Sequence, residues 1–184
     1  MAFTVIDHEE LSSNTSSVTL NDGGSNIPSS YAHLYLACSV RSNSGYRDNF
    51  KLWFNGDSSG GNYSRQELAA YGSPTALKDY GQHYIDLQHA CAGSATEGSV
   101  FSQFHIWIMN YAETNNDKQA LIEWSRPNWD SGVGGQQWGI GVAAGLRNTT
   151  GAITSVSCGA GNSFVSGSSF TLYGVSAPTL AATA

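Results

Sequence analysis

Alternation of apolar and polar side chains is the feature that most constrains the fold of this chain. In the stretch "HLYLACSVR", residues 33–41, leucine, cysteine and valine take the even positions and mostly polar residues take the odd ones. Such period-two alternation predicts a β-strand with one buried face. The Ile27-Pro28 step before it favours extended or turn backbone, which is typical of the entry to a strand.

Similar strand-like segments recur along the chain between clusters of glycine, serine and asparagine. The segment 62–72 predicts either a strand or a short helix, ended by Gly72, Ser73 and Pro74. The other predicted strands are 3–11, 16–20, 50–56, 83–90, 99–113, 118–127, 136–148, 152–161 and 168–177. About ten short strands at this spacing are typical of an all-β sandwich or a closed barrel. We expect a single antiparallel, jelly-roll-like β-sandwich domain over residues 1–176, followed by an extended tail, 177–184.

The segment 99–113 is the strongest candidate for the core, because apolar residues occupy both its even and its odd positions, which point to opposite faces of a strand. Its even-numbered residues are predicted to point into the core, together with the even-numbered residues of segment 33–41. The predicted inward residues are Leu34, Leu36, Val40, Phe104, Ile106 and Ile108. The other parity carries His105, Trp107 and Met109, which need cover from loops or from a neighbouring subunit. These three residues are therefore candidate interface residues.

Charge argues against nucleic acid and anionic membranes as partners. The net charge is −6, and the eight lysines and arginines are scattered singly rather than gathered into a basic patch. No apolar run approaches the roughly 20 residues of a membrane span, and no signal peptide is apparent. We expect a chain that folds or assembles in a cytoplasm. Its three cysteines, which lack zinc-like spacing, are expected to be buried free thiols.

Candidate catalytic residues do not converge in the sequence. None of the common hydrolase, metalloprotease or nucleotide-binding motifs is present. His8, His83 and His89 have no spacing that suits a common metal. Five acidic residues could supply a glycosidase pair, although we expect them to be solvated surface: Glu67, Asp86, Glu113, Glu123 and Asp130. The sequence therefore predicts a protein without enzymatic activity, metal or cofactor.

Five tryptophans and nine tyrosines permit stacking on sugars, although most are expected to fill the core or a subunit interface. Trp129, in "RPNWDSG", is the best candidate for exposure because proline and glycine flank it. The candidate interface or glycan contacts are Trp107, Trp129, His105 and Met109.

The order of landmarks resembles a family of β-sandwich proteins from tailed bacteriophages. The landmarks are "SVTL", "IPSSYAHLYLACSVRS", "LWFNGD" with "NYSRQEL", "FSQFHIWIMNYAE" and "AITSVSCGAGNSFVSGSSFTLYGV". They span about residues 5–175, and their order and spacing carry the resemblance more than any single motif. The resemblance implies a jelly-roll virion module of the kind found as small structural proteins and as tail-fibre domains. It carries no catalytic residue.

Two virion roles follow from this resemblance. A capsid decoration (cement) protein would sit on the shell as a homo-oligomer, with a trimer implied, and contact the major capsid protein. A tail-fibre or baseplate adhesin would bind a glycan or receptor on the host surface. Decoration is favoured, because the sequence lacks the coiled-coil heptads or collagen-like repeats of a fibre shaft. A cellular carbohydrate-binding module or lectin is a weaker alternative, because no secretion signal is apparent.

Overall fold

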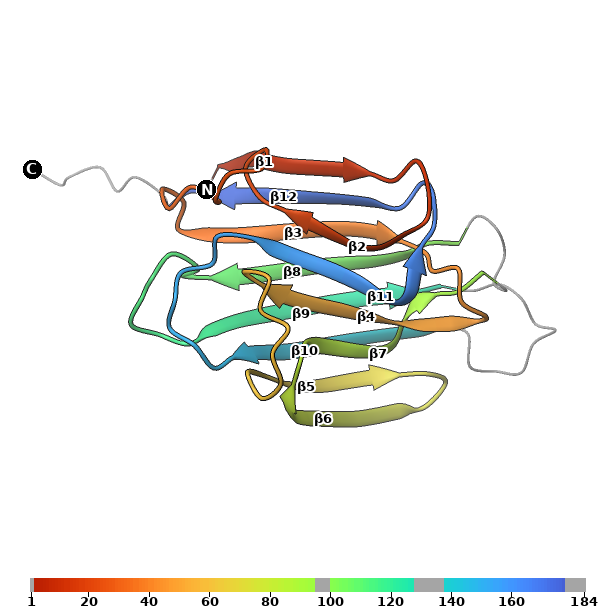
Figure 1. Ribbon diagram of the computed structural model, residues 1–184. Coiled ribbons are helices and arrows are strands. Elements are labelled where there is room, and N and C mark those ends of the chain that lie inside the picture. The colour runs from red at the N-terminus through yellow and green to blue at the C-terminus, as the bar shows by residue number, and fades with distance from the viewer. Residues whose placement is uncertain (1, 95–99, 128–137, 178–184) are drawn as a thin grey trace, which may run out of the picture.

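A computed structural model of the chain describes residues 2–94, 100–127 and 138–177. Within these ranges it contains twelve β-strands and no helix, and the strands form two antiparallel sheets that pack face to face (Figure 1). The predicted all-β sandwich is confirmed.

The two sheets differ in width. The large sheet has eight strands, in the order β1 (Phe3–Glu10), β12 (Ser169–Val175), β3 (His33–Val40), β8 (Ser102–Met109), β9 (Lys118–Arg126), β10 (Gly139–Arg147), β5 (Tyr63–Ala70) and β6 (Pro74–Gln82). The small sheet has four, in the order β2 (Thr15–Leu20), β11 (Val156–Phe164), β4 (Arg47–Phe54) and β7 (Ile85–Ala92). Because β7 is the last strand of the small sheet and contacts β5, β9 and β10, the large sheet extends past it to β6.

One strand was missing from the sequence-based expectation. Within the segment 62–72, Tyr63–Ala70 form the strand β5 rather than a helix, but β6 follows shortly after and begins at Pro74, where we expected a break. The first position of an edge strand tolerates proline, because its missing N–H takes no part in the ladder. The segment also lacks an apolar alternation, since β6 is an edge strand without a fully buried residue.

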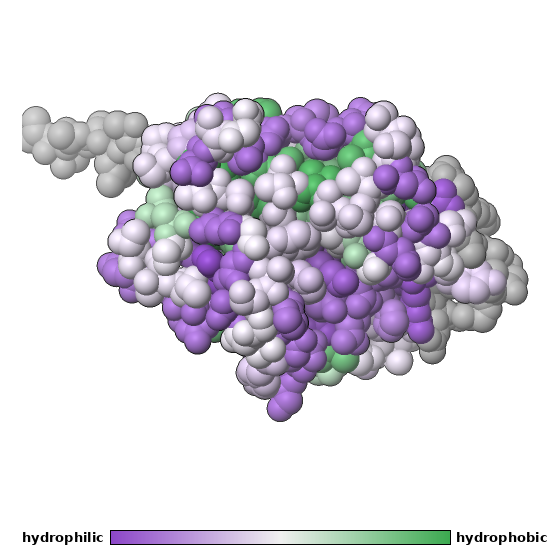
Figure 2. Space-filling view, in the orientation of Figure 1, coloured by the Kyte–Doolittle hydropathy of each residue, from purple (hydrophilic) through white to green (hydrophobic). Residues whose placement is uncertain are grey.

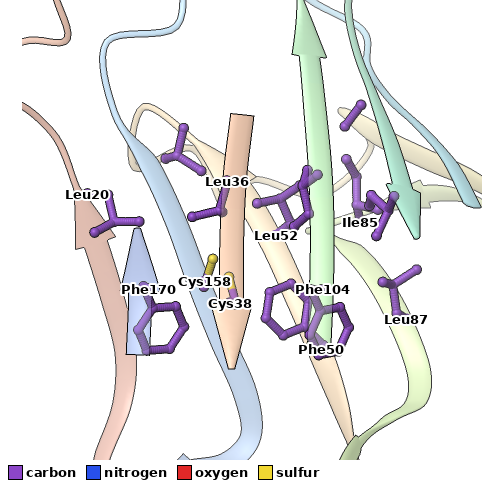
Figure 3. Close-up of a cluster of buried hydrophobic side chains, with 14 of the residues drawn as sticks. Leu20, Leu36, Cys38, Phe50, Leu52, Ile85, Leu87, Phe104, Cys158 and Phe170 are labelled. Atoms are coloured by element: carbon purple, nitrogen blue, oxygen red, sulfur yellow. The ribbon is translucent and has the colours of Figure 1, made fainter. Parts of the chain in front are cut away.

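The core lies between the two sheets and follows the predicted parity. All six predicted inward residues are fully buried. Leu36 and Ile106 are direct partners on the neighbouring strands β3 and β8. Phe50 of the small sheet stacks on Phe104 of the large sheet with ring centroids 4.0 Å apart (Figure 3). This aromatic pair joins the two layers.

The three cysteines, all within the described residues, are buried free thiols, as predicted. Cys38 of β3 and Cys158 of β11 lie beside each other between the sheets (Figure 3). Burial raises the pKa of the Cys38 thiol well above its ordinary value, and the neighbouring Cys158 adds to this effect. Both side chains are buried and serve as small apolar residues of the core.

The Asn55-Gly56 pair forms the turn that leads the chain from the small sheet to the large one. Both residues have positive φ, 57° and 65°, and the N–H of Asp57 donates to the carbonyl of Phe54 at 3.0 Å. The Asp57 carboxylate then accepts a hydrogen bond from Arg147 Nη2 at 3.2 Å. The end of β4 is thus tied to the end of β10.

The exposed side of the small sheet is polar. Figure 2 shows this side of the molecule, where hydrophilic and near-neutral residues prevail. On β4, the outward side chains include Asn49 and Lys51. The predicted contact residues lie elsewhere.

Candidate interaction surface

The predicted contact residues of β8 all lie on one surface, the face of the large sheet that points away from the small sheet. We call it the outer face. His105 is exposed there, Met109 is 46% exposed and Trp107 is partly buried. The fourth predicted contact, Trp129, lies outside the described residues, as does Asp130. The structure therefore brings three of the four candidates together.

Half of the outer face, over β1, β12, β3 and β8, carries a cluster of aromatic rings. Trp107 and Tyr35 are cross-strand partners with ring centroids 4.8 Å apart, and Tyr173 lies 5.9 Å from Tyr35. Phe3, from β1, meets all three rings at centroid distances of 5.7 to 6.0 Å. The chain's own first strand thus supplies part of the cover that Trp107 was expected to need.

A polar group lies next to these rings. The hydroxyl of Tyr35 is hydrogen-bonded to Nδ1 of His105, and His105 is the cross-strand partner of Glu123 on β9. Burial, with smaller contributions from Tyr173 and Glu123, raises the pKa of Tyr35 above its ordinary value. The phenol therefore stays protonated at neutral pH, and the arrangement offers hydrogen bonds but no activated nucleophile.

The other half of the large sheet, over β9, β10, β5 and β6, is unusual because charged residues lie among the apolar ones on its inward side. Its inward parity carries charged residues, all of them buried: Arg65, Glu67, Lys118, Arg126 and Arg147. Buried charges need partners, because desolvation penalises an isolated one. Lys118 Nζ donates to the carbonyls of Glu113 and Asn116 at 2.5 and 2.7 Å.

Glu67 is held by two side chains, Arg65 and Trp124. Arg65 Nη1 donates to Glu67 Oε2 at 2.5 Å, and Arg65 Nη2 lies 2.8 Å from Asp79 Oδ2. Trp124 Nε1 donates to Glu67 Oε1 at 2.9 Å. Burial raises the pKa of Glu67 above its ordinary value, although Arg65 and Trp124 oppose the rise.

The expectation that Glu67 is a solvated surface residue is therefore wrong. Its strand turns this parity toward the interior, where Arg65 and Trp124 hold the carboxylate. Asp86 is also partly buried, and it accepts a hydrogen bond from Asn49 Nδ2 at 3.2 Å. Glu113 and Glu123 are exposed, as expected.

Aliphatic side chains occupy the outward parity of the same strands. They form a surface that we call the aliphatic patch, made of Leu68 (60% exposed), Leu121 (48%), Ile140 (63%) and Val142 (41%). Val142 is the direct partner of Leu68, and Leu121 is the direct partner of Ala144, the residue after Ala143 on β10. No other part of the described chain covers these side chains.

Glycine explains why β10 faces this way. A Cβ at Gly141 would lie 2.5 Å from Nε1 of Trp124, and one at Gly145 would lie 2.5 Å from Ile85. The inward parity of β10 must therefore stay small, and its large residues point outward. The sequence signal was present in "GIGVAAGLR", where glycine and alanine take one parity and aliphatics take the other. The sequence analysis missed this signal because it treated glycine as a residue that separates strands.

Catalytic or metal-binding geometry is not apparent in the described parts of the chain. There, no group of three histidine, cysteine, aspartate or glutamate side chains is placed to hold a metal ion. Nδ1 of His83 donates to the carbonyl of Ser58 at 2.7 Å, and His89 lies in a register shift of β7 with φ of 61°. The same residues include no helix that could span a membrane.

Comparisons with known proteins give no information about the role of this surface. No protein-family model, no curated protein and no solved structure matches the chain.

Proposed function

We propose that the chain is a structural protein of a tailed-bacteriophage virion, without enzymatic activity, that decorates the capsid shell as a homo-oligomer. The observation that carries the proposal is the outer face of the large sheet. On it a small domain leaves four large aliphatic side chains exposed on adjoining strands. Apolar surfaces of this kind, rimmed by polar residues, are typical of protein–protein contact sites.

Two further features support a role in assembly. Sequence landmarks over residues 5–175 resemble the phage β-sandwich family, and the sandwich architecture agrees with that resemblance. Charged residues make up only 12% of the chain, which suits dense packing beside other subunits, where unpaired buried charges are costly. The protein would assemble in the host cytoplasm and reside in the virion, with itself and the major capsid protein as partners.

The location of the protein in the virion is the direct test. Mass spectrometry of separated heads and tails should find the chain in heads, and purified protein should bind isolated capsids. Removing residues 178–184 should weaken capsid binding while the sandwich stays folded. Detection in tails alone, together with no binding to capsids, would contradict the decoration role.

The absence of catalysis can be tested on the same preparation. We expect no release of sugar from host-surface polysaccharides by the purified protein, with or without added divalent metal. Product release that Glu123→Gln abolishes would refute the claim. Glu123 suits this test because it is the exposed acid beside His105.

An adhesin on the tail fibre or baseplate is the second candidate function. One observation favours it, the indole of Trp138, which is 57% exposed at the start of β10. Exposed indoles stack well on sugar rings. Binding of the protein to host cells that Trp138→Ala removes, together with its detection in tails, would support the adhesin in place of the decoration protein.

A further inference from the structure

We propose that the aliphatic patch packs against the same patch of a second copy of the chain, in a contact with two-fold symmetry. This inference rests on the proposed function, because it names the partner at the surface that carries it. The argument uses the chemistry of the patch, its charges and its size.

The chemistry of the patch suits a protein partner. Its four side chains are aliphatic, so it lacks the flat rings on which sugars stack. Small residues lie among these side chains on the same parity, including Ala70, Ala76 and Ala144. Large side chains beside small ones allow two facing sheets to interlock, as the inner faces of a β-sandwich do.

The register of the strands defines how two patches would meet. A two-fold axis that runs along the strands, between β10 and β5, places β10 of one copy over β5 of the other. Val142 then lies over Leu68 of the second copy, because the two are direct cross-strand partners within one chain. Ile140 likewise lies over Ala70 of the second copy, so that a large side chain meets a small one.

Two charges at the margins of the patch fit this arrangement. Glu123 on β9 and Lys78 on β6 are exposed, and neither forms an ion pair within the described parts of the chain. Three strand spacings separate them, about 14 Å, which is too far for them to pair in one chain.

The same two-fold axis brings these charges together between copies. It places β9 over β6 of the second copy, with Glu123 opposite Ala76, because both align with Val142 and Leu68. Lys78 lies two residues farther along β6, about 7 Å away, within reach of its long side chain. Each copy would contribute one such pair, so the contact is complementary to itself.

The size of the patch agrees with a dimer of modest affinity. The contact would include the whole half of the outer face around the patch, and four strands at about 4.8 Å spacing and about eight residues long at about 3.4 Å each cover about 500 Å² per copy. Two copies together bury about 1,000 Å², near the lower limit for a specific interface. The contact therefore predicts a dimer, or an assembly of dimers, in place of the trimer that the family resemblance implies.

The first experiment measures the mass of the purified full-length chain. Sedimentation and light scattering should report a dimer within about 1 to about 200 µM, the range that brackets an interface of this size. Leu68→Glu, at the centre of the patch, should give a monomer at every concentration. Val5→Glu is the matched control, since Val5 is 57% exposed on the same face but lies at its far edge, on β1. It should leave the dimer intact.

The second experiment tests the charges without touching the aliphatic side chains. Glu123→Lys and Lys78→Glu should each raise the dimer dissociation constant several-fold, because each places like charges across the contact. The double variant should restore the dissociation constant toward that of the unmodified chain. This test remains valid if Leu68→Glu fails to fold.

The outcomes separate this inference from the proposed function. A monomer at all concentrations, a trimer, or a dimer that neither Leu68→Glu nor the charge reversals weaken would overturn the two-fold contact. A trimer that binds capsids would still support the decoration protein. A dimer found only in tails would keep the contact and refute the decoration role.

Discussion

The indole Nε1 of Trp124 donates a hydrogen bond to Oε1 of Glu67, 2.9 Å away, beneath the aliphatic patch. The two residues come from strands that are separated by β10, and the indole lies across Gly141 of that strand. The bond acts together with the buried side chains of Tyr63 and Ile122 to hold this parity of β5 and β9 inward. The opposite parity, which carries Leu68 and Leu121, therefore faces outward.

Removing the buried carboxylate should destabilise the fold. We expect Glu67→Ala to lower the free energy of unfolding by about 1–3 kcal/mol, because the buried donors Trp124 Nε1 and Arg65 Nη1 would lose their acceptor, while Asp79 still pairs with Arg65. Urea denaturation followed by tryptophan fluorescence measures the change. Glu113→Ala is the control, since Glu113 is exposed, and should alter stability little. Equal effects of the two substitutions would contradict the structural role of Glu67.

Filling the space beneath the indole should also destabilise the fold. A Cβ at Gly141 would lie 2.5 Å from Nε1 of Trp124, so Gly141→Ala must displace the indole from Glu67. We expect a loss of about 1–3 kcal/mol from this overpacking, measured by thermal or chemical denaturation. At Gly151 an added Cβ meets nothing within 4 Å, which makes Gly151→Ala the matched control. A fully stable Gly141→Ala variant would show that the indole can move freely.

Truncating a side chain at the centre of the core should leave a cavity and destabilise the fold. Leu36 and Ile106 are fully buried cross-strand partners, so replacing either with alanine should cost about 2–5 kcal/mol. Because the two residues are neighbours, the double variant should depart from the sum of the single changes. Glu9→Ala, on an exposed position of β1, is the control for both. A cost well below this range would mean that the site is less tightly packed than the structure indicates.

Acid should weaken the tie between β4 and β10. Burial acts to raise the pKa of Asp57, but hydrogen bonds from Ser59, Asn62 and Arg147 outweigh it and hold the pKa below its ordinary value of 3.8. A carboxyl group with a lowered pKa in the folded state contributes stability above its unfolded pKa. That contribution is lost as the pH falls through the folded pKa.

The comparison with Asp57→Asn isolates this effect from other carboxylates. The unmodified chain should be more stable than the variant above about pH 4, and the difference should shrink as the pH is lowered below 3.8. Denaturation curves collected from pH 2 to pH 7 on both proteins, a range that spans the acid titration of aspartate, provide the measurement. A difference that does not change with pH would rule out the proposed electrostatic origin.

Regular alternation made the all-β class and much of the core predictable. On β3 and β8 the apolar parity is unbroken, so Leu36 and Ile106 could be placed in the core from sequence alone. The edge strand β6 could not be found, because an edge strand need not alternate. The aliphatic patch was missed because β5 carries charges on its inward parity. Their partners, such as Trp124, are distant in sequence, and only the assembled sheet brings them together.

The pairing of β1 with β12 links the first strand of the chain to the last one, along nearly their whole lengths. A ribosome adding about 5–20 residues per second needs roughly ten to thirty seconds to make the residues between them. During that time β1 has no partner strand in the large sheet, and the ring of Tyr173, which Phe3 contacts in the folded chain, has not been made. The sheet is therefore completed only after residue 175 has been synthesised. A nascent chain that stalls before residue 169 leaves the edge of β3 open to pairing with another chain.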